Sequence, residues 1–175
     1  MVGATTIQDM NLQDMVTMAP SIVVGTVESS SSRWNDDRSL IVTDVRIRVV
    51  DVLKGPSVSE VVITQPGGRV GKLRVDVDGA AAYPVGDEAV LFLASDAKGQ
   101  QQVLGLSRGR FDIVTDARSG KKTVRGLKAS DVATLQASKP GLNDVLASPD
   151  SALRMQLDDF LTGVRQLVVN AKGGK

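Results

Sequence analysis

The residue types that most often carry enzyme chemistry are sparse in this sequence. Its 175 residues include no cysteine and no histidine. This composition excludes thiolate nucleophiles, disulfides, histidine general bases, Ser-His-Asp triads and the common zinc sites. Carboxylates are therefore the main candidates for acid–base or metal chemistry. They are grouped at Asp36-Asp37, at Asp76-Val77-Asp78 and at Asp158-Asp159.

None of these groups has the arrangement that such chemistry requires. Asp76 and Asp78 resemble a fragment of a calcium loop, but no further acidic ligand follows at the required spacing. In each adjacent pair the two carboxylates diverge, because neighbouring residues do not share a face. We therefore predict no metal site, no cofactor and no catalytic residue, and we interpret the protein as non-enzymatic. A hydrolase that uses only Asp, Glu, Ser or Lys is the weakest alternative.

Two other stretches could bind phosphate or nucleic acid. Residues 67–72 are rich in glycine but lack the spacing of a phosphate loop and the helix that follows it. Residues 108–128 contain seven Lys and Arg residues. A nucleic-acid face usually adds aromatic platforms, and only Phe111 lies nearby, while Asp112 and Asp116 interrupt the positive charge. The net charge of +1 also provides no global attraction. We favour a solvated hairpin, with a nucleic-acid-binding protein as the alternative.

Trp34 is the residue most suggestive of a binding role. It is the only tryptophan, and it lies between Arg33 and Asn35 in a polar segment that offers no obvious core. An exposed aromatic ring in a loop often anchors a protein partner. Tyr83, in a loop rich in glycine and alanine, is a second candidate contact. The predicted binding residues are Arg33, Trp34, Asn35 and Tyr83; the alternative for Trp34 is that its ring covers one end of the fold.

The element that must position these residues is a long hairpin over residues 21–53. Gly25 lies among β-forming residues and predicts a bulge. The alternation of apolar and polar residues changes phase near Val50, which indicates a second irregularity. Further strands are predicted at 59–65, 72–78, 88–93, 101–106, 110–115 and 121–124. The strand residues predicted to be buried are Ile22, Val24, Val45, Ile47, Val75, Leu91 and Leu93.

Helices are predicted near both ends of the chain. A short one, capped by Asn11, covers residues 11–19, and an amphipathic one begins at Asp150 or Ser151. We expect a flexible N-terminus (1–10), a β-barrel domain with the N-terminal helix (11–127), a turn-rich linker (128–149) and a C-terminal helix packed on the barrel (150–170). No apolar run is long enough to span a membrane.

These elements predict a mainly β fold. We expect a small OB-like β-barrel with a long bulged hairpin, a short N-terminal helix and a C-terminal helix. An immunoglobulin-like sandwich is the second choice, because the Cys–Trp–Cys pattern of that fold is missing.

Three segments, 19–27, 43–55 and 85–93, carry a resemblance to known proteins. They contain V-V-G-T-V, V-L-K-G and V-G-D-E-A-V-L-F-L. In this order they resemble a class of uncharacterised exported bacterial proteins and, more remotely, the netrin-like OB barrels of tissue inhibitors of metalloproteinases. The resemblance implies an extracytoplasmic protein, periplasmic or secreted after removal of a leader.

The resemblance also implies a protein partner, in an inhibitor-like or protease-associated role. Those inhibitors place an N-terminal cysteine on the catalytic zinc of their target. This chain has no cysteine, so we do not expect inhibition by that route. A structural or assembly protein is a further alternative.

Overall fold

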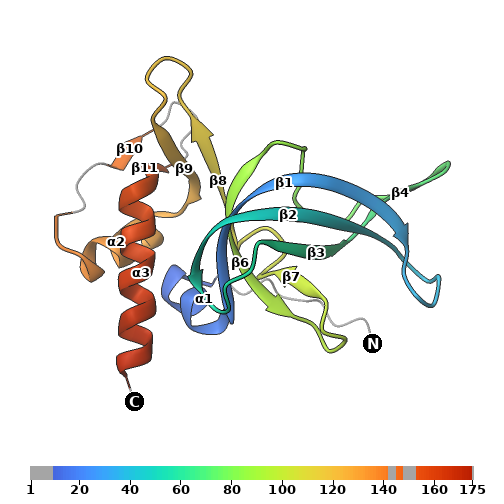
Figure 1. Ribbon diagram of the computed structural model, residues 1–175, viewed down its shortest axis with the longest axis horizontal. Helices are drawn as coiled ribbons and strands as arrows, with labels where there is room; N and C mark the ends of the chain where they lie inside the picture. Colours follow the sequence, from blue (N-terminus) through green and yellow to red (C-terminus); the bar gives the residue numbers. More distant parts are fainter. Residues whose placement is uncertain (1–9, 142–144, 148–152, 175) are drawn as a thin grey trace.

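The computed structural model describes residues 10–141, 145–147 and 153–174 (Figure 1). The prediction of a flexible N-terminus concerns residues 1–10, and nine of these, 1–9, lie outside the described ranges. The fold is mainly β, as predicted. The strands are β1 (Ser21–Trp34), β2 (Ile41–Lys54), β3 (Glu60–Pro66), β4 (Gly68–Val70), β5 (Leu73–Val75), β6 (Glu88–Ser95), β7 (Gln101–Val103), β8 (Arg110–Thr115), β9 (Lys122–Leu127), β10 (Val145–Ala147) and β11 (Leu153–Gln156). The helices are α1 (Leu12–Met18), α2 (Ala129–Ser138) and α3 (Leu157–Gly173).

Five strands form a ring in the order β1-β2-β3-β7-β6, because β6 pairs again with β1. The closing pairs run from Ser21 opposite Leu93 to Thr26 opposite Glu88. The contact between β3 and β7 is parallel and consists of one residue pair, so the ring is thinnest there. Aliphatic side chains fill the interior; the buried ones include Val23, Val27, Val45, Ile47, Ile63, Leu91 and Leu93.

The sheet continues from β6 out of the ring, through β8, β9, β11 and β10. The three helices pack on this side of the molecule (Figure 1). Their core includes the three phenylalanines, Phe92, Phe111 and Phe160. Strand β1 contributes to both cores, since Ile22 and Val24 face the helices while Val23 and Val27 face the ring interior.

The long hairpin is irregular where the sequence predicted it to be. Its pairing register shifts between Val24 and Gly25, which confirms the bulge. A Cβ atom on Gly25 would lie 2.8 Å from the carbonyl oxygen of Arg48, so only glycine lets the two strands approach this closely. Val24 and Gly25 pair with Asp51 and Val49, which leaves Val50 without a partner. The predicted change of phase therefore coincides with a real irregularity.

The short helix α1 is capped as predicted. The side-chain oxygen of Asn11 accepts a hydrogen bond of 2.9 Å from the backbone of Asp14. At the other end, the ammonium group of Lys54 donates to the carbonyl oxygen of Val16 at 2.6 Å. Burial lowers the pKa of Lys54, and the charge of Lys172 lowers it further. These contacts fix α1 against the end of the long hairpin.

The C-terminal part of the chain differs from the prediction in two ways. Residues 129–138 form the helix α2 where we expected a turn-rich linker; its large apolar side chains are only Val132 and Leu135, too few for a clear helical period. Helix α3 begins at Leu157 rather than near residue 150, because residues 153–156 pair with β9 as the strand β11. The predicted capping positions, 150 and 151, lie outside the described ranges. The amphipathic character of α3 is confirmed, since its buried residues share one face.

All the strand residues predicted to be buried are buried except Val75, which is half-buried. Leu73, in the same predicted strand (72–78), is 58% exposed. Both belong to a separate two-stranded sheet, β4–β5, instead of the ring. Within the described ranges, none of the helices has the length and hydrophobicity needed to cross a membrane.

Candidate binding site

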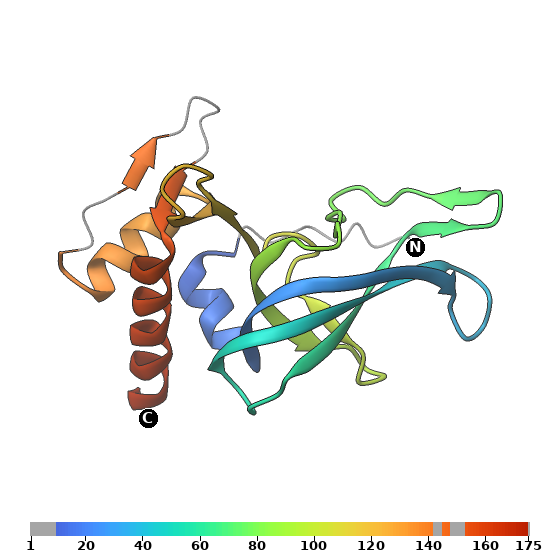
Figure 2. The same cartoon turned by 45° about the horizontal axis from the view of Figure 1, so that its top comes forward.

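Two hairpins reach the same end of the molecule, opposite the helices (Figures 1 and 2). One is the tip of the β1–β2 hairpin, residues 33–42. The other is the β4–β5 hairpin, residues 68–75, which lies against β1 and β2. We call these two hairpins the distal end. It contains three of the four predicted binding residues.

Asn35 builds the turn at the tip of β1–β2. Its side-chain oxygen accepts hydrogen bonds from the backbone N–H groups of Ser39 and Leu40, at 2.9 and 3.0 Å. Its own N–H donates to the carbonyl oxygen of Leu40 at 2.8 Å. Arg38, at the turn, has a φ of 56°. The polar atoms of Asn35 therefore hold the loop in one shape, which suits a positioning role.

Arg33 is held by an ion pair on the outer face of the sheet. Its Nε atom lies 2.5 Å from a carboxylate oxygen of Asp44, and Asp44 also accepts a hydrogen bond of 2.7 Å from the hydroxyl of Thr64. Burial alone would raise the pKa of Asp44, but the hydrogen bonds from Arg33 and Thr64 and the charge of Arg33 bring this pKa below its usual value. Arg33 also donates to the carbonyl oxygen of Trp34 at 3.2 Å, which fixes the backbone there.

Trp34 is the exposed residue of the predicted set, with 37% of its surface accessible. It pairs with Ile41, and Ser32 pairs with Thr43, so these four side chains share one face of the hairpin. That face meets the β4–β5 hairpin, because a Cβ atom on Gly68 would collide with the hydroxyl groups of Ser32 and Thr43. Trp34 thus lies on the face of the long hairpin that meets β4–β5, and its side chain is partly open to solvent.

Tyr83 does not belong to this surface. It is 7% exposed and packs inside the ring, which differs from the exposed contact that we expected. The guanidinium of Arg110 lies over its ring, 4.4 Å from the centroid, and Arg110 also donates to the carbonyl oxygen of Ala82. Burial raises the pKa of Tyr83, and the positive charge of Arg110 opposes this effect. Gln65 donates to Ala81 at 2.9 Å, so this loop is tied to both β3 and β8.

The basic stretch at residues 108–128 is partly used inside the protein. Arg108 forms an ion pair of 2.6 Å with Asp131, whose side chain is fully buried. The Arg110 side chain is 7% exposed and lies 2.7 Å from Asp112. Lys122 pairs with Glu88 at 2.6 Å. These contacts leave a weaker positive surface than the sequence suggested.

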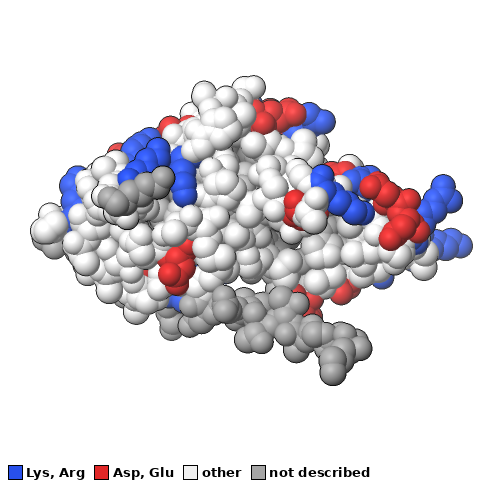
Figure 3. Space-filling view, turned by 90° about the horizontal axis from the view of Figure 1, so that it is seen from below, with Lys and Arg blue, Asp and Glu red and all other residues white. Residues whose placement is uncertain are grey.

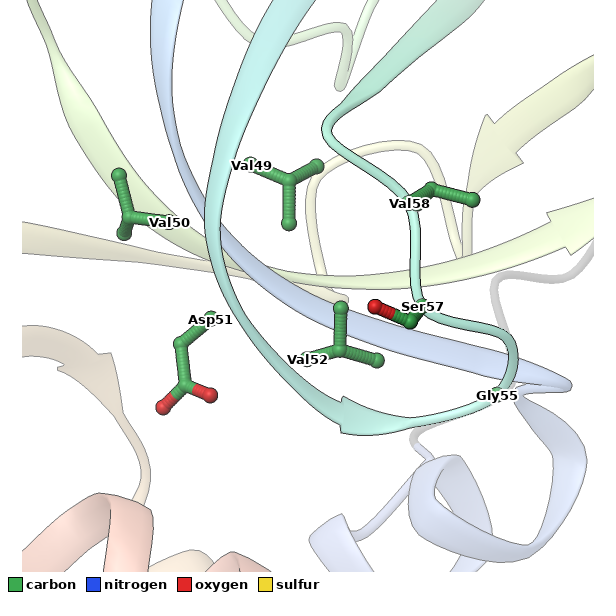
Figure 4. Close-up of a pocket in the computed structure, with 7 residues that line it drawn as sticks. All are labelled: Val49, Val50, Asp51, Val52, Gly55, Ser57 and Val58. Carbon is green, nitrogen blue, oxygen red and sulfur yellow. The ribbon is translucent and has the colours of Figure 1, made fainter.

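A surface hollow of about 420 Å³ lies beside the end of β2 (Figure 4). Val49 and Val52 point from β2 toward the loop that carries Ser57, whereas Val50 lies on the opposite side of the strand. Asp51 is the one carboxylate of the lining, and it pairs with Arg165 of α3. The lining residues therefore do not include a second titratable side chain that could act with Asp51 as a catalytic acid–base pair.

Sequence reasoning overlooked the β4–β5 hairpin as a surface. Its tip, Arg69-Val70-Gly71-Lys72-Leu73-Arg74, combines three cations with an exposed leucine. Lys and Arg side chains gather at this end of the molecule, with Asp and Glu directly beside them (Figure 3). The charge at the distal end is thus mixed, not uniformly positive.

Acidic side chains do not gather into a metal site in the part of the chain that the structure describes; no group of three or more potential ligands occurs there. Comparison with protein-family models, with curated proteins and with solved structures finds no match for this chain.

Proposed function

We propose that this protein is a non-enzymatic interaction module that binds a protein partner through its distal end. The observation that carries the proposal is the partly exposed ring of Trp34 on a rigid support. Arg33 fixes the backbone at this position, and Asn35 fixes the turn that follows. An aromatic side chain that is already ordered loses little conformational entropy on binding, and tryptophan is enriched among the residues that dominate interface energies.

We further propose that the five-stranded ring is OB-like. The closing of β6 on β1, the thin contact between β3 and β7 and the total of five strands suit the partly open, five-stranded barrel of that fold. OB-fold proteins use the loop between their first two strands for recognition, and Trp34 immediately precedes the corresponding loop here. With the sequence resemblance described above, this supports an exported protein with an inhibitor-like or protease-associated role.

The test is the variant Trp34→Ala, assayed for partner capture from the extracytoplasmic fraction of the native host. Circular dichroism first establishes that the variant is folded at the assay temperature. The matched control is Val62→Ala, since Val62 is similarly exposed, at 40%, but lies on β3. We expect Trp34→Ala to lose partners that the control retains. If both variants capture the same proteins as the unchanged chain, the proposal is wrong.

Nucleic-acid binding receives less support from the structure. Arg108 and Arg110 are engaged within the protein, and at the distal end Asp36 and Asp76 lie beside Arg33 and Arg74. A salt titration with fluorescent oligothymidine tests this alternative. Micromolar binding that weakens steeply with salt would favour it over a protein partner.

A further inference from the structure

The β4–β5 hairpin places two arginines directly opposite each other. Arg69 pairs with Arg74 across this two-stranded sheet, so both side chains lie on the same face. Like charges in this position destabilise a strand pair. An isolated two-stranded hairpin is also only marginally stable on its own. The repulsion is therefore a cost that a bound anion would remove.

The face that carries the two arginines points away from the rest of the molecule. Gly68 pairs with Val75, and Val70 pairs with Leu73, so these residues form the opposite face. Gly68 lies against the hydroxyl groups of β1 and β2, which places that opposite face toward the long hairpin. Arg69 and Arg74 are accordingly exposed, and no part of the described chain is seen to cover this face.

The charges on the arginine face are only partly compensated. Arg74 lies 2.8 Å from Asp76, but both side chains are more than two-thirds exposed, at 70% and 74%. Arg69 donates to the carbonyl oxygen of Gly71 at 3.1 Å and has no carboxylate partner among the described residues. Lys72, in the turn between the strands, also lacks one in the same part of the chain. Among the described residues, the three cations Arg69, Lys72 and Arg74 thus have one carboxylate partner, Asp76, which lies beside Arg74.

We infer that the arginine face of the β4–β5 hairpin binds an acidic segment of a protein partner, with a partner carboxylate placed between Arg69 and Arg74. Arginine suits this task because its planar guanidinium can donate two parallel hydrogen bonds to a carboxylate. The inference rests on the proposed interaction role and names the chemistry of the partner. The mixed charge of the distal end fits a short acidic segment of a protein better than a nucleic acid or an anionic lipid surface, because an extended negative surface would also meet Asp36 and Asp37 at the neighbouring hairpin tip.

The probe is a synthetic acidic peptide of alternating threonine and glutamate, with a threonine–glutamine peptide as its neutral counterpart. Each is titrated into the full chain labelled with ¹⁵N, and backbone amide shifts are followed by NMR. We expect the acidic peptide to shift amides of residues 68–75 and the neutral peptide to have no effect. Raising the salt concentration should weaken the shifts, because the contact is between exposed charges.

The decisive variant is the double substitution Arg69→Gln with Arg74→Gln. We expect it to weaken binding of the acidic peptide by about tenfold, since two charge-assisted contacts are lost. The control is Arg118→Gln with Lys121→Gln, which removes two exposed cations from the β8–β9 turn. That control should change the affinity by less than about twofold. Thermal unfolding of both variants shows that the effect is not a loss of folding.

Several results would overturn the inference. Equal weakening in the control pair, or amide shifts spread over all basic segments, would mean nonspecific attraction. Equivalent shifts with inorganic phosphate would mean a general anion site. Tighter binding of oligothymidine would assign the face to nucleic acid. The Trp34→Ala capture assay is independent of the peptide titration: peptide binding with unchanged capture would refute the proposed function alone, and lost capture without peptide binding would refute this inference alone.

Discussion

The two ends of the molecule use the same type of ion pair in different surroundings. At the end that carries the helices, the proximal end, Arg108 and Asp131 lie 2.6 Å apart with side chains 10% and 0% exposed. At the distal end, Arg33 and Asp44 lie 2.5 Å apart with side chains 40% and 25% exposed. A buried pair is costly to break because one charge is left without solvent or partner, whereas water compensates much of the loss at a surface. The proximal pair therefore holds the fold, and the distal pair positions a surface.

The largest effect is expected from Asp131→Ala. Asp131 also accepts a hydrogen bond of 2.8 Å from the backbone of Lys128, at the start of α2. Its removal leaves Arg108 buried and unpaired, and should lower the free energy of unfolding by about 3–5 kcal/mol. Urea denaturation measures this change. The double variant Arg108→Met with Asp131→Leu should recover most of the loss; a single-variant effect under about 1 kcal/mol would remove the contrast between the two ends.

The next effect concerns the ring interior, which supports the distal hairpins. Ile47 is 1% exposed in this core. We expect Ile47→Ala to lower the free energy of unfolding by about 2–5 kcal/mol, because it empties a packed site. Val62→Ala, on exposed β3 surface, should change it by no more than about 0.5 kcal/mol. Equal effects in chemical denaturation would contradict the assignment of Ile47 to the core.

A smaller effect is expected from Asp44→Asn, and it depends on pH. The folded pKa of Asp44 is lowered, so its contribution to stability is present above the unfolded pKa of about 3.9 and is lost as pH falls through the folded value. Because the pair is partly exposed, the loss at neutral pH should be about 1 kcal/mol. Thermal unfolding between neutral and acidic pH should show a shallower decline for the variant. An identical decline would mean that Asp44 is not stabilised in the folded protein.

The smallest effect is expected from Leu73→Ala at the tip of β4–β5. Leu73 is 58% exposed, so the change in the free energy of unfolding should be at most about 0.5 kcal/mol. Differential scanning calorimetry provides the measurement. A drop comparable to that of Ile47→Ala would show that the distal hairpins form a core of their own. The distal end would then contribute to the stability of the fold, as the proximal end does.

The sequence predicted those parts of the fold that depend on local patterns. Alternation located β2, runs of β-forming or apolar residues located β1 and β6, and Gly25 marked the bulge because close approach of two strands leaves a local signature. The pattern at 72–78 was misleading for the same reason. Alternation shows that two faces differ, but it does not show whether another layer covers the apolar face of Leu73.

Nonlocal contacts account for the remaining differences. Leu153 and Leu157 have helical spacing, yet the pairing of Leu153 with Leu127 makes its segment a strand. Helix α2 depends on packing by Val132 and Leu135, and on a buried ion pair to a residue 23 positions earlier. None of these partners can be identified from the segment itself.

The residues of the candidate site also divide into those whose positions follow from local patterns and those whose positions depend on nonlocal contacts. Trp34 lies near the turn of the long hairpin, as predicted from the polar segment around it, but it is the last residue of strand β1 and does not belong to the loop. Burial of Tyr83 depends on Arg110, 27 residues later in the chain, and could not be read from a loop of small residues. The opposition of Arg69 and Arg74 follows from a two-residue turn at Gly71 and Lys72, whereas Lys72 was predicted to begin a strand.

The closing of β6 on β1 also determines when the fold can be completed during synthesis. Ser21 must wait for Leu93 to leave the ribosome before the two can pair, although β1 and β2 can pair much earlier. Until then the edge of β1 that later pairs with β6 is unpaired, and unpaired strand edges promote association between chains. The nascent protein therefore passes through an interval in which its longest hairpin is complete but vulnerable, and a chaperone that shields strand edges would act most effectively during that interval.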